Sequence, residues 1–323
     1  MSSNKLTLAN AVLLGPMSGV NDPIFRSICK RYGADLTYSE MISAAGLAYK
    51  NAKTSDLLYH DPSDSPFCLQ LFGKDPGQIA HQAAELELLY GEALALIDLN
   101  MACPARKVVS KGEGAALMQN PQLAETIIKD VVENVSLPVT VKIRRGYLEG
   151  EETAVEFARM AEAAGASAVA VHGRWAVQLY TGQADKSLIG RVKSAVLIPV
   201  IASGDVFGVS DVVSYFDGQG ADAVMVARGA QGRPWVFAQV KAALTGSAKE
   251  PAEASLPERL SIAKEHTLRL AEVFPHRLAM MKKHIAWYFK GTAQASAIRS
   301  KVNLCSGLSD YLALFEQIAA GEL

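Results

Sequence analysis

The amino-acid sequence predicts an α/β protein: a closed (β/α)8 TIM barrel followed by a small C-terminal helical domain. Two observations predict the barrel. Eight short apolar runs alternate with amphipathic helical stretches over roughly 240 residues, the usual size of this fold. The runs are also apolar almost throughout, as expected for parallel strands with both faces covered. An open, doubly wound sheet fits less well, because no Gly-x-Gly-x-x-Gly motif follows the first run.

The expected elements alternate regularly along the chain. Amphipathic periodicity predicts helices at Gln78–Leu89, Pro121–Asn134 and Thr153–Ala164. Glycine ends several helices just before the chain becomes extended again, as at Gly165 and Gly220. The predicted strands are Ala11–Leu14, Leu36–Ser39, Phe67–Phe72, Leu94–Asn100, Val139–Ile143, Ala168–His172, Val200–Ser203 and Ala223–Ala227.

Length and composition favour a globular, cytoplasmic protein. The 323 residues are 50% hydrophobic with a formal net charge of −1, and no apolar run is long enough to cross a membrane. The segment Met1–Asn10 lacks the pattern of a secretory signal peptide. The four cysteines are widely spaced and form no CxxC motif or ligand cluster with histidine. We therefore expect no membrane association, no disulfide framework and no metal site.

The C-terminal part has a different character. Residues 246–257 are rich in Ala, Glu, Lys, Pro and Ser, which predicts a linker between a barrel at 1–245 and helices at 258–323. Residues 274–303 contain no acidic residue, and Trp287, Tyr288 and Phe289 lie in their middle. Segregated positive charge with aromatic residues favours nucleic-acid binding, and a solvated helix face is the alternative. The six basic residues of this run are Arg277, Lys282, Lys283, Lys290, Arg299 and Lys301.

The most informative stretch is Asn100-Met101-Ala102-Cys103-Pro104, at the end of the fourth predicted strand. Proline cannot continue the sheet, so the chain must turn there. Asn100 and Cys103 then lie at the carboxyl end of a barrel strand, where active sites form. Arg106, Lys107 and Lys111 follow closely, and cationic neighbours favour a reactive thiol. The alternative is a cysteine that only packs in the core.

Polar residues also end the other predicted strands. Lys142 stands in an apolar strand, where an unpaired charge would be costly, so we expect it to meet an anion. The glycine-rich turns after strands seven and eight match the usual phosphate site of these barrels. The other strand ends carry Pro16-Met17-Ser18, Gln70, Arg144-Arg145, His172-Gly173-Arg174, Ser203-Gly204-Asp205 and Ala227-Arg228.

These motifs resemble those of the tRNA-dihydrouridine synthases, FMN-dependent barrel enzymes that reduce the 5,6 double bond of uridines in tRNA. The resemblance runs from about Leu8 to Lys301, and the Asn-x-x-Cys-Pro element is its most specific part. The stretch Lys283-His284-Ile285-Ala286-Trp287-Tyr288 resembles the bacterial subgroup B.

The resemblance implies a role for each candidate residue. NADPH or NADH would reduce the flavin, and hydride would pass from the flavin to C6 of uracil. Cys103 would donate the proton to C5. Asn100, Arg144 and Arg174 would bind the uridine, with His172 beside the uracil, and Lys282 and Lys283 would bind the tRNA. We also expect a monomer. The residues implied to hold FMN are Pro16, Met17, Ser18, Gln70, Lys142, His172, Ser203, Gly204, Asp205, Ala227 and Arg228.

The sequence departs from the family pattern at five positions. Ser203 stands where the family usually has Asn, Ala102 and Ala227 where it has Gly, Gly15 where it has Ala, and Trp175 where it has Thr. We expect Trp175 at the entrance for the uridine. Two alternatives remain open at this stage: a flavin barrel that acts on a small molecule, and a non-catalytic tRNA-binding paralogue.

Overall fold

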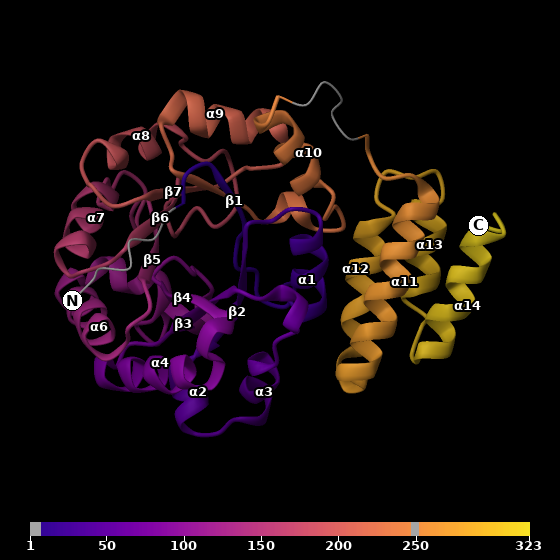
Figure 1. The fold of residues 1–323 in the computed structure, drawn as a ribbon, viewed down its shortest axis with the longest axis horizontal. Coiled ribbons are helices and arrows are strands. Elements are labelled where there is room, and N and C mark those ends of the chain that lie inside the picture. Colours follow the sequence, from indigo (N-terminus) through magenta and orange to yellow (C-terminus); the bar gives the residue numbers. More distant parts are fainter. Residues whose placement is uncertain (1–7, 247–251) are drawn as a thin grey trace.

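Eight parallel strands close into a barrel in the computed structural model, which describes residues 8–246 and 252–323 (Figure 1). Each strand pairs with its neighbours in sequence, and β1 pairs with β8 to close the ring. The predicted fold class is therefore confirmed. The strands are β1 (Ala11–Leu14), β2 (Leu36–Ser43), β3 (Phe67–Phe72), β4 (Leu94–Asn100), β5 (Val139–Arg144), β6 (Ala168–His172), β7 (Val200–Ser203) and β8 (Ala223–Val226).

The barrel strands are apolar on both faces because each face lies in a different core. Leu13, Tyr38 and Met225 belong to a cluster inside the barrel. Val12 and Leu14, the neighbours of Leu13, belong to the larger core that also includes side chains of the surrounding helices. Successive side chains of a strand point to opposite faces, so both sets must be hydrophobic. This explains the continuous apolar runs of the sequence.

Helices connect the strands and surround the barrel (Figure 1). Asp22 caps α1, where its carboxylate accepts from the backbone N–H groups of Ile24 and Phe25. Short 3₁₀ turns lie at Asp56–Leu58, Pro62–Asp64, Gly91–Ala93, Gly114–Gln119, Arg228–Ala230 and Pro275–Met280. The helices of this part are α1 (Pro23–Arg31), α2 (Ala44–Ala48), α3 (Ala52–Ser55), α4 (Pro76–Tyr90), α5 (Arg106–Val109), α6 (Pro121–Asn134), α7 (Ala154–Ala163), α8 (Ser187–Lys193), α9 (Val209–Gln219) and α10 (Val236–Leu244).

The predicted strand bounds agree with the structure except at three ends. β5 is one residue longer than predicted, and β8 is one residue shorter. β2 continues to Ser43, four residues beyond the predicted end at Ser39. Its pairing with β3 is irregular between Tyr38 and Met41, and the polar Glu40 interrupts the apolar run there. The predicted strand therefore ended at Ser39, because the apolar pattern breaks where the pairing becomes irregular.

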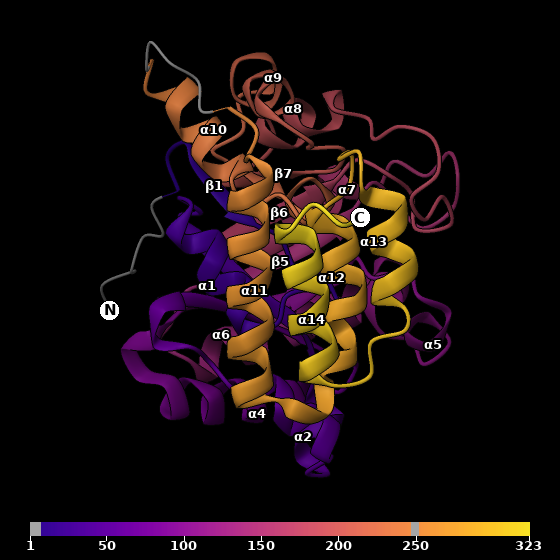
Figure 2. The ribbon, with the colours of Figure 1, turned by 90° about the vertical axis from the view of Figure 1, so that its right-hand side faces the viewer.

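The C-terminal helices α11 (Leu256–Val273), α12 (Met281–Tyr288), α13 (Ala295–Val302) and α14 (Leu308–Ala319) pack beside the barrel (Figure 2). Their shared core takes in Ile24 and Ile28 of α1, together with Trp235. α11 begins inside the segment predicted as a linker, and residues 247–251 of that segment lie outside the described residues. Among the described residues, no helix has the length and apolar character needed to span a membrane.

Candidate active site

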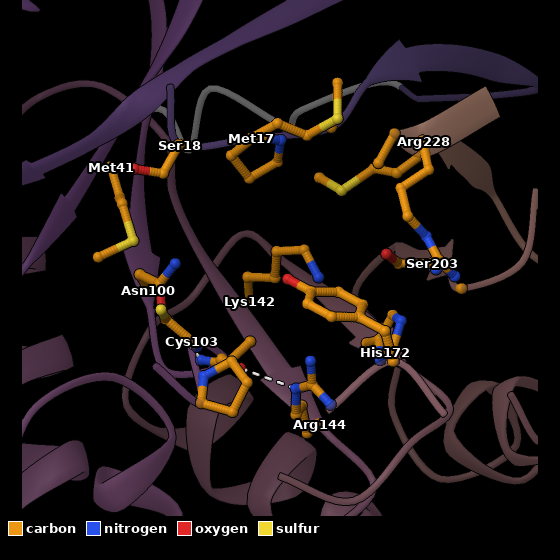
Figure 3. Close-up of a pocket in the computed structure, with 18 of the residues that line it drawn as sticks. Met17, Ser18, Met41, Asn100, Cys103, Lys142, Arg144, His172, Ser203 and Arg228 are labelled. Carbon is orange, nitrogen blue, oxygen red and sulfur yellow. Dashed lines mark hydrogen bonds between the residues drawn. The ribbon is translucent and has the colours of Figure 1, made fainter. Parts of the chain in front are cut away.

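A pocket of about 480 Å³ opens at the carboxyl ends of the barrel strands (Figure 3). This is the size of a typical cofactor or small-ligand site. The structure brings together there all of the residues implied to hold FMN, along with three other candidates. The candidate residues on the pocket wall are Pro16, Met17, Ser18, Gln70, Asn100, Cys103, Lys142, Arg144, His172, Ser203, Gly204, Asp205, Ala227 and Arg228.

Asn100 shapes the turn that carries Cys103. Its Oδ1 accepts from the backbone N–H groups of Cys103 at 2.9 Å and Ala102 at 3.2 Å. This side-chain turn occupies the acceptor oxygen of Asn100, so any uracil contact falls to its amide nitrogen. On the other side, the Cys103 carbonyl accepts from the Ala115 N–H at 3.0 Å. Gly114 has φ +60°, and a Cβ there would lie 2.7 Å from the Cys103 oxygen. The half-buried thiol is thus held on a fixed loop.

A buried hydrogen-bond chain links Asn100 to the barrel interior. The Asn100 amide donates to Gln70 Oε1 at 2.7 Å, and the Gln70 amide donates to Asp98 at 2.6 Å. Thr140 donates to the other Asp98 oxygen at 2.5 Å. Burial raises the pKa of Asp98 to about 6, although these hydrogen bonds and the nearby Lys142 oppose the rise. Gln70 is therefore already oriented, with its amide donating inward.

Lys142 lies opposite Asn100 in the β4–β5 pairing and faces the pocket. Burial lowers its pKa to about 8, with Arg144 adding to the effect, while Asp98 and Cys103 act in the other direction. The described residues supply no ion pair to the Lys142 ammonium. The sequence predicted that this lysine meets an anion, and the pocket is the space from which one can approach.

Arg144 lines the pocket, but most of its guanidinium is already engaged. Its Nε donates to the Ala102 carbonyl at 2.8 Å (Figure 3), and its Nη1 donates to the carbonyls of Trp175 and Leu179, both at 2.9 Å. Burial lowers its pKa to about 10. These bonds join the Cys103 loop to the loop after β6. Arg144 is thus a structural tie as well as a positive charge on the wall.

His172 is a neutral imidazole on the same wall. It is 8% exposed, and its Nδ1 has no hydrogen-bond partner among the described residues. Burial holds its pKa well below the usual range, and the surrounding charges of Lys142, Arg144, Arg174 and Arg228 reinforce the effect. A buried ring nitrogen without a partner is rare in native proteins, so it points to a ligand atom in the pocket.

Asp205 joins the turns after β6, β7 and β8. Its Oδ2 accepts from Arg174 at 2.6 Å and from the Ala184 N–H at 2.8 Å, and its Oδ1 accepts from Arg228 at 2.9 Å. Gly204 before it has φ +118°, and a Cβ there would lie 2.8 Å from the Cβ of Ala184. The turn therefore needs glycine to pack this closely. Asp205 thus aligns Arg228 along the rim.

Arg174 was predicted to bind the uridine, but it does not line the pocket. It is 1% exposed, and besides Asp205 it donates to the carbonyls of Thr181 and Gly182. Its guanidinium holds the loop after β6 in place. The strand-end position was predicted correctly, but a side chain two residues past a strand end can turn to either side, which the motif does not specify.

Trp175 also lies outside the pocket wall. Its indole N–H donates to the Glu151 carbonyl at 2.6 Å, and the Arg145 guanidinium stacks 4.1 Å from its ring centre. It is absent from the pocket wall. The pocket therefore gives no support to the expectation that Trp175 stands where the uridine enters, which stays a prediction.

Sequence reasoning missed the aromatic rim of the pocket. Tyr180 and Phe207 are 58% and 46% exposed, and their ring centres lie 5.2 and 5.5 Å from the Arg228 guanidinium. Both residues follow a predicted strand end, so an aromatic residue in such a loop was the available signal. Met41 was missed because the predicted second strand stopped before it.

The basic run 274–303 serves several purposes in the structure. Arg277 pairs with the buried Glu40 at 3.1 Å, and Lys283 donates to the carbonyl of Gly19, so both hold the C-terminal helices against the barrel. Lys282 donates to the Asn303 carbonyl at 2.8 Å. Lys290 and Arg299 are exposed. Lys283, predicted to bind tRNA, is thus first a contact between the two parts of the molecule.

The aromatic residues of this run are not an exposed stacking surface. Tyr288 and Phe289 are fully buried in the core of the C-terminal helices, and Trp287 packs against the barrel core. These aromatic residues therefore give no support to the predicted nucleic-acid contact. Positive charge remains as the feature of this run that suits a polyanion.

The pocket wall is suited to an anionic ligand. The wall carries three basic side chains, Lys142, Arg144 and Arg228, and one carboxylate, that of Asp205. Asp205 is already paired with two guanidinium groups, so positive charge is in excess. The partnerless His172 nitrogen adds one polar atom. These groups fit a phosphorylated flavin, with the phosphate near Arg228 and the turns after β7 and β8.

Comparison with known proteins assigns the family. The model of the family described as "Dihydrouridine synthase (Dus)" matches residues 13–321. The chain is 38% identical over 319 residues to the "Probable tRNA-dihydrouridine synthase" of Rickettsia conorii, covering 97% of this chain and 94% of that protein. It is 38% identical over 299 residues to the "tRNA-dihydrouridine synthase B" of Pseudomonas aeruginosa, covering 92% and 89%.

A likeness to a solved structure supports the fold alone. Histamine dehydrogenase from Rhizobium sp. 4-9 superposes with a TM-score of 0.53 at 15% identity, covering 80% of this chain and about half, 49%, of that one. The family match and the two relatives, in contrast, extend over nearly the whole sequence. The chain therefore belongs to the dihydrouridine synthase family of enzymes.

Proposed function

We propose that this protein is a flavin-dependent tRNA-dihydrouridine synthase that reduces the 5,6 double bond of particular uridines in tRNA. One observation carries the proposal. In a chain of this family, a half-buried cysteine and three basic side chains line the same pocket. We further propose that it is a cytoplasmic monomer. Its parts would be a catalytic barrel at 1–245, a linker that ends where α11 begins at Leu256, and a tRNA-binding domain formed by the C-terminal helices.

FMN is the proposed cofactor, with NADPH or NADH as the reductant. When bound, the flavin accepts hydride from the nicotinamide and delivers hydride to C6 of uracil. Arg228 and the turns at Gly204 and Gly229 would hold its phosphate. Lys142 would stabilise negative charge on the ring, because a cation next to a developing anion in a dry site lowers its energy. Gln70, fixed by Asp98, would meet the polar edge of the ring.

Cys103 is the proposed proton donor to C5 of uracil. The Asn100 side chain and Gly114 hold its loop at the pocket wall, so the thiol is presented in a fixed position. Arg144 and His172 lie on the same wall and would bind the uracil oxygens or exclude water from them. Because His172 is neutral, it can donate one hydrogen bond without adding charge.

The tRNA would contact exposed basic residues around the pocket and on the C-terminal helices. Arg106 and Lys107 of α5 follow the Cys103 loop and are exposed, as are Lys290 and Arg299. Cations in such positions neutralise backbone phosphates without reading sequence. The target uridine must leave its stack to reach a pocket inside the barrel mouth.

The decisive experiment has two parts. The purified protein should be yellow or take up FMN, and NADPH should bleach the flavin. Incubation with unmodified tRNA should then produce dihydrouridine, and tRNA from a strain that lacks the gene should lose dihydrouridine at the corresponding position. A flavoprotein that oxidises NADPH without modifying tRNA would favour a small-molecule reductase. A protein that binds tRNA but takes up no flavin would favour a non-catalytic paralogue.

A further inference from the structure

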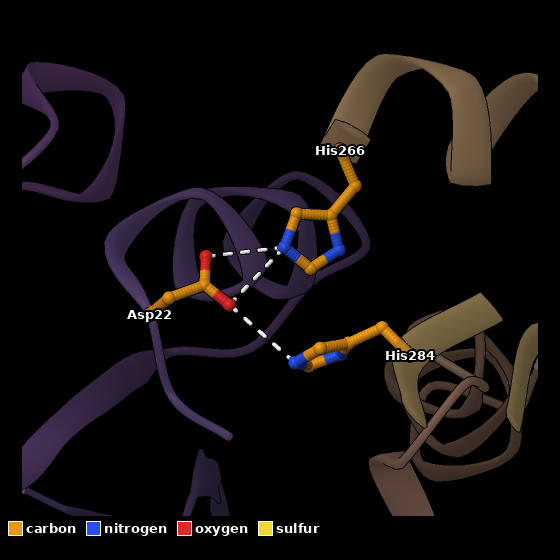
Figure 4. A group of neighbouring side chains, drawn as sticks. All are labelled: Asp22, His266 and His284. Atoms are coloured by element: carbon orange, nitrogen blue, oxygen red, sulfur yellow. Dashed lines mark hydrogen bonds and ion pairs between the residues drawn. The ribbon is translucent and has the colours of Figure 1, made fainter. Parts of the chain in front are cut away.

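Three metal-ligating side chains meet where the C-terminal helices contact the barrel (Figure 4). Asp22 precedes α1 of the barrel, His266 belongs to α11, and His284 belongs to α12. All three are buried, with 0–1% of each residue exposed. One ligand atom from each lies within 4.8 Å of the other two. Asp22 follows the pocket residues Ser18 and Val20 closely in sequence, but none of the three side chains lines the pocket, and the cluster plays no part in the proposed reaction.

The distances from Asp22 to the two imidazoles suit tetrahedral coordination. Asp22 Oδ2 lies 3.1 Å from His266 Nε2 and 3.6 Å from His284 Nε2. A zinc ion with bonds of about 2.0–2.1 Å places neighbouring tetrahedral ligands about 3.3 Å apart. The two distances lie on either side of that value. Asp22 Oδ1 accepts the backbone N–H groups that begin α1, so Oδ2 is the oxygen left for an ion.

His284 is the observation that points to a missing ligand. Neither of its ring nitrogens has a hydrogen-bond partner among the described residues, although the side chain is fully buried. Its Nε2 points toward the Asp22 carboxylate (Figure 4). A free imidazole nitrogen that faces a carboxylate in a buried site is a donor pair suited to a zinc-type cation.

The surroundings of His266 complete the pattern. Its Nδ1 lies 2.9 Å from the hydroxyl of Tyr288. Metal-bound histidines almost always use their second nitrogen in this way, because the contact fixes the ring and its tautomer. The ring of Phe25 packs against both imidazoles, at 6.1 Å from His266 and 5.4 Å from His284, and helps keep the cluster dry.

We propose that Asp22, His266 and His284 bind one zinc-type divalent cation, with water as the fourth ligand, and that this ion fastens the C-terminal helices to the barrel. In the ion-bound form the His266 proton would sit on Nδ1 and be donated to Tyr288, leaving Nε2 for the metal. Two histidines and one carboxylate are a common zinc donor set. No metal was expected from the sequence, because these ligands follow no spacing motif and are up to 262 residues apart.

The test is the metal content and metal affinity of the full-length, untagged protein. Protein produced with added zinc should retain about one zinc per chain after desalting. The metal-free protein should bind Co²⁺ with the visible bands of a tetrahedral complex, and zinc should displace it. Asp22→Asn, which keeps the cap of α1, and His284→Gln should each lose the retained metal. Tyr288→Phe keeps all three ligands and should weaken binding about 10–100-fold.

His276→Gln is the matched control, because it removes an exposed histidine that is paired with Asp56 outside the cluster. It should retain zinc as the wild type does. A chelator should lower the thermal midpoint of the wild type and leave that of His284→Gln unchanged. If the wild type holds no more zinc than Asp22→Asn, or if Co²⁺ gives only the spectrum of a hydrated ion, the proposal is wrong. If the cluster variants do not fold, the Co²⁺ titrations of the wild type and Tyr288→Phe still decide it.

Discussion

Replacing Lys142 with methionine should stabilise the flavin-free protein and weaken its binding of FMN. The cause is the burial that lowers the pKa of Lys142 from 10.5 to about 8. At 1.36 kcal/mol for each pKa unit, burying the charged lysine lowers the free energy of unfolding at pH 7 by about 3 kcal/mol. Methionine removes that cost with similar volume, but it also removes an attractive neighbour of Asp98. We therefore expect a net gain of about 1–3 kcal/mol in the free energy of unfolding.

The pH dependence of this gain has a definite sign. Below about pH 8, Lys142 is protonated in both the folded and the unfolded chain, so the full cost is present. Between about pH 8 and 10.5 the unfolded chain binds the proton more tightly than the folded one, so the stability contributed by this site rises with pH. The advantage of Lys142→Met over the wild type should therefore shrink steadily across this range.

Urea unfolding of the flavin-free proteins at pH 7, 8.5 and 10 measures this difference directly. Lys142→Arg is the matched control, because it keeps the charge and should show no gain. The same proteins titrated with FMN should bind it more weakly in the methionine variant than in the arginine variant. A Lys142→Met protein that is less stable than the wild type at pH 7, or whose advantage does not change with pH, would refute the reasoning.

Three further predictions follow from the site. Cys103→Ala should keep flavin binding and flavin reduction, while single-turnover reoxidation by tRNA slows about 10²–10⁴-fold, the usual worth of a positioned acid; reoxidation at the wild-type rate would make the thiol structural. Reversing Lys290 and Arg299 to Glu should weaken tRNA binding and reduce its salt dependence without changing NADPH oxidation, and unchanged affinity would identify a simple solvated face. Arg174→Met should cost about 3–5 kcal/mol of stability, measured by urea unfolding, because Asp205 loses a buried partner; a loss confined to the KM for tRNA would restore the predicted uridine contact.

The architecture and the pocket wall were predictable because both depend on local pattern. Strand ends can be recognised from apolar runs that stop at Pro104 or at glycine, and in a parallel barrel all such ends meet on one face. That geometry places Cys103, Lys142 and Arg228 together without any knowledge of packing. β2, whose pairing with β3 is irregular, was predicted too short, and Met41 was lost with it.

The direction of a side chain beyond a strand end was not predictable in the same way. Arg144 and Arg174 are both basic residues near the ends of adjacent strands, yet only Arg144 reaches the pocket. Arg174 turns instead to Asp205 and to two carbonyls of its own loop. These partners are set by the path of the loop 174–186, which carries no periodic pattern. A motif therefore located these residues without assigning their roles.

The basic run shows that sequence alone does not tell which charged residues stabilise the fold and which are free to bind a ligand. Arg277 and Lys283 face a carboxylate and a carbonyl of the barrel, 237 and 264 residues earlier in the chain. Lys290 and Arg299, from the same run, face solvent. Docking the C-terminal helices uses positive charge for the same physical reason as binding a phosphate backbone, because both partners present oxygen atoms. A charge reversal at Lys283 would therefore weaken tRNA binding even if no phosphate touches it, whereas Lys290 and Arg299 report on the RNA alone.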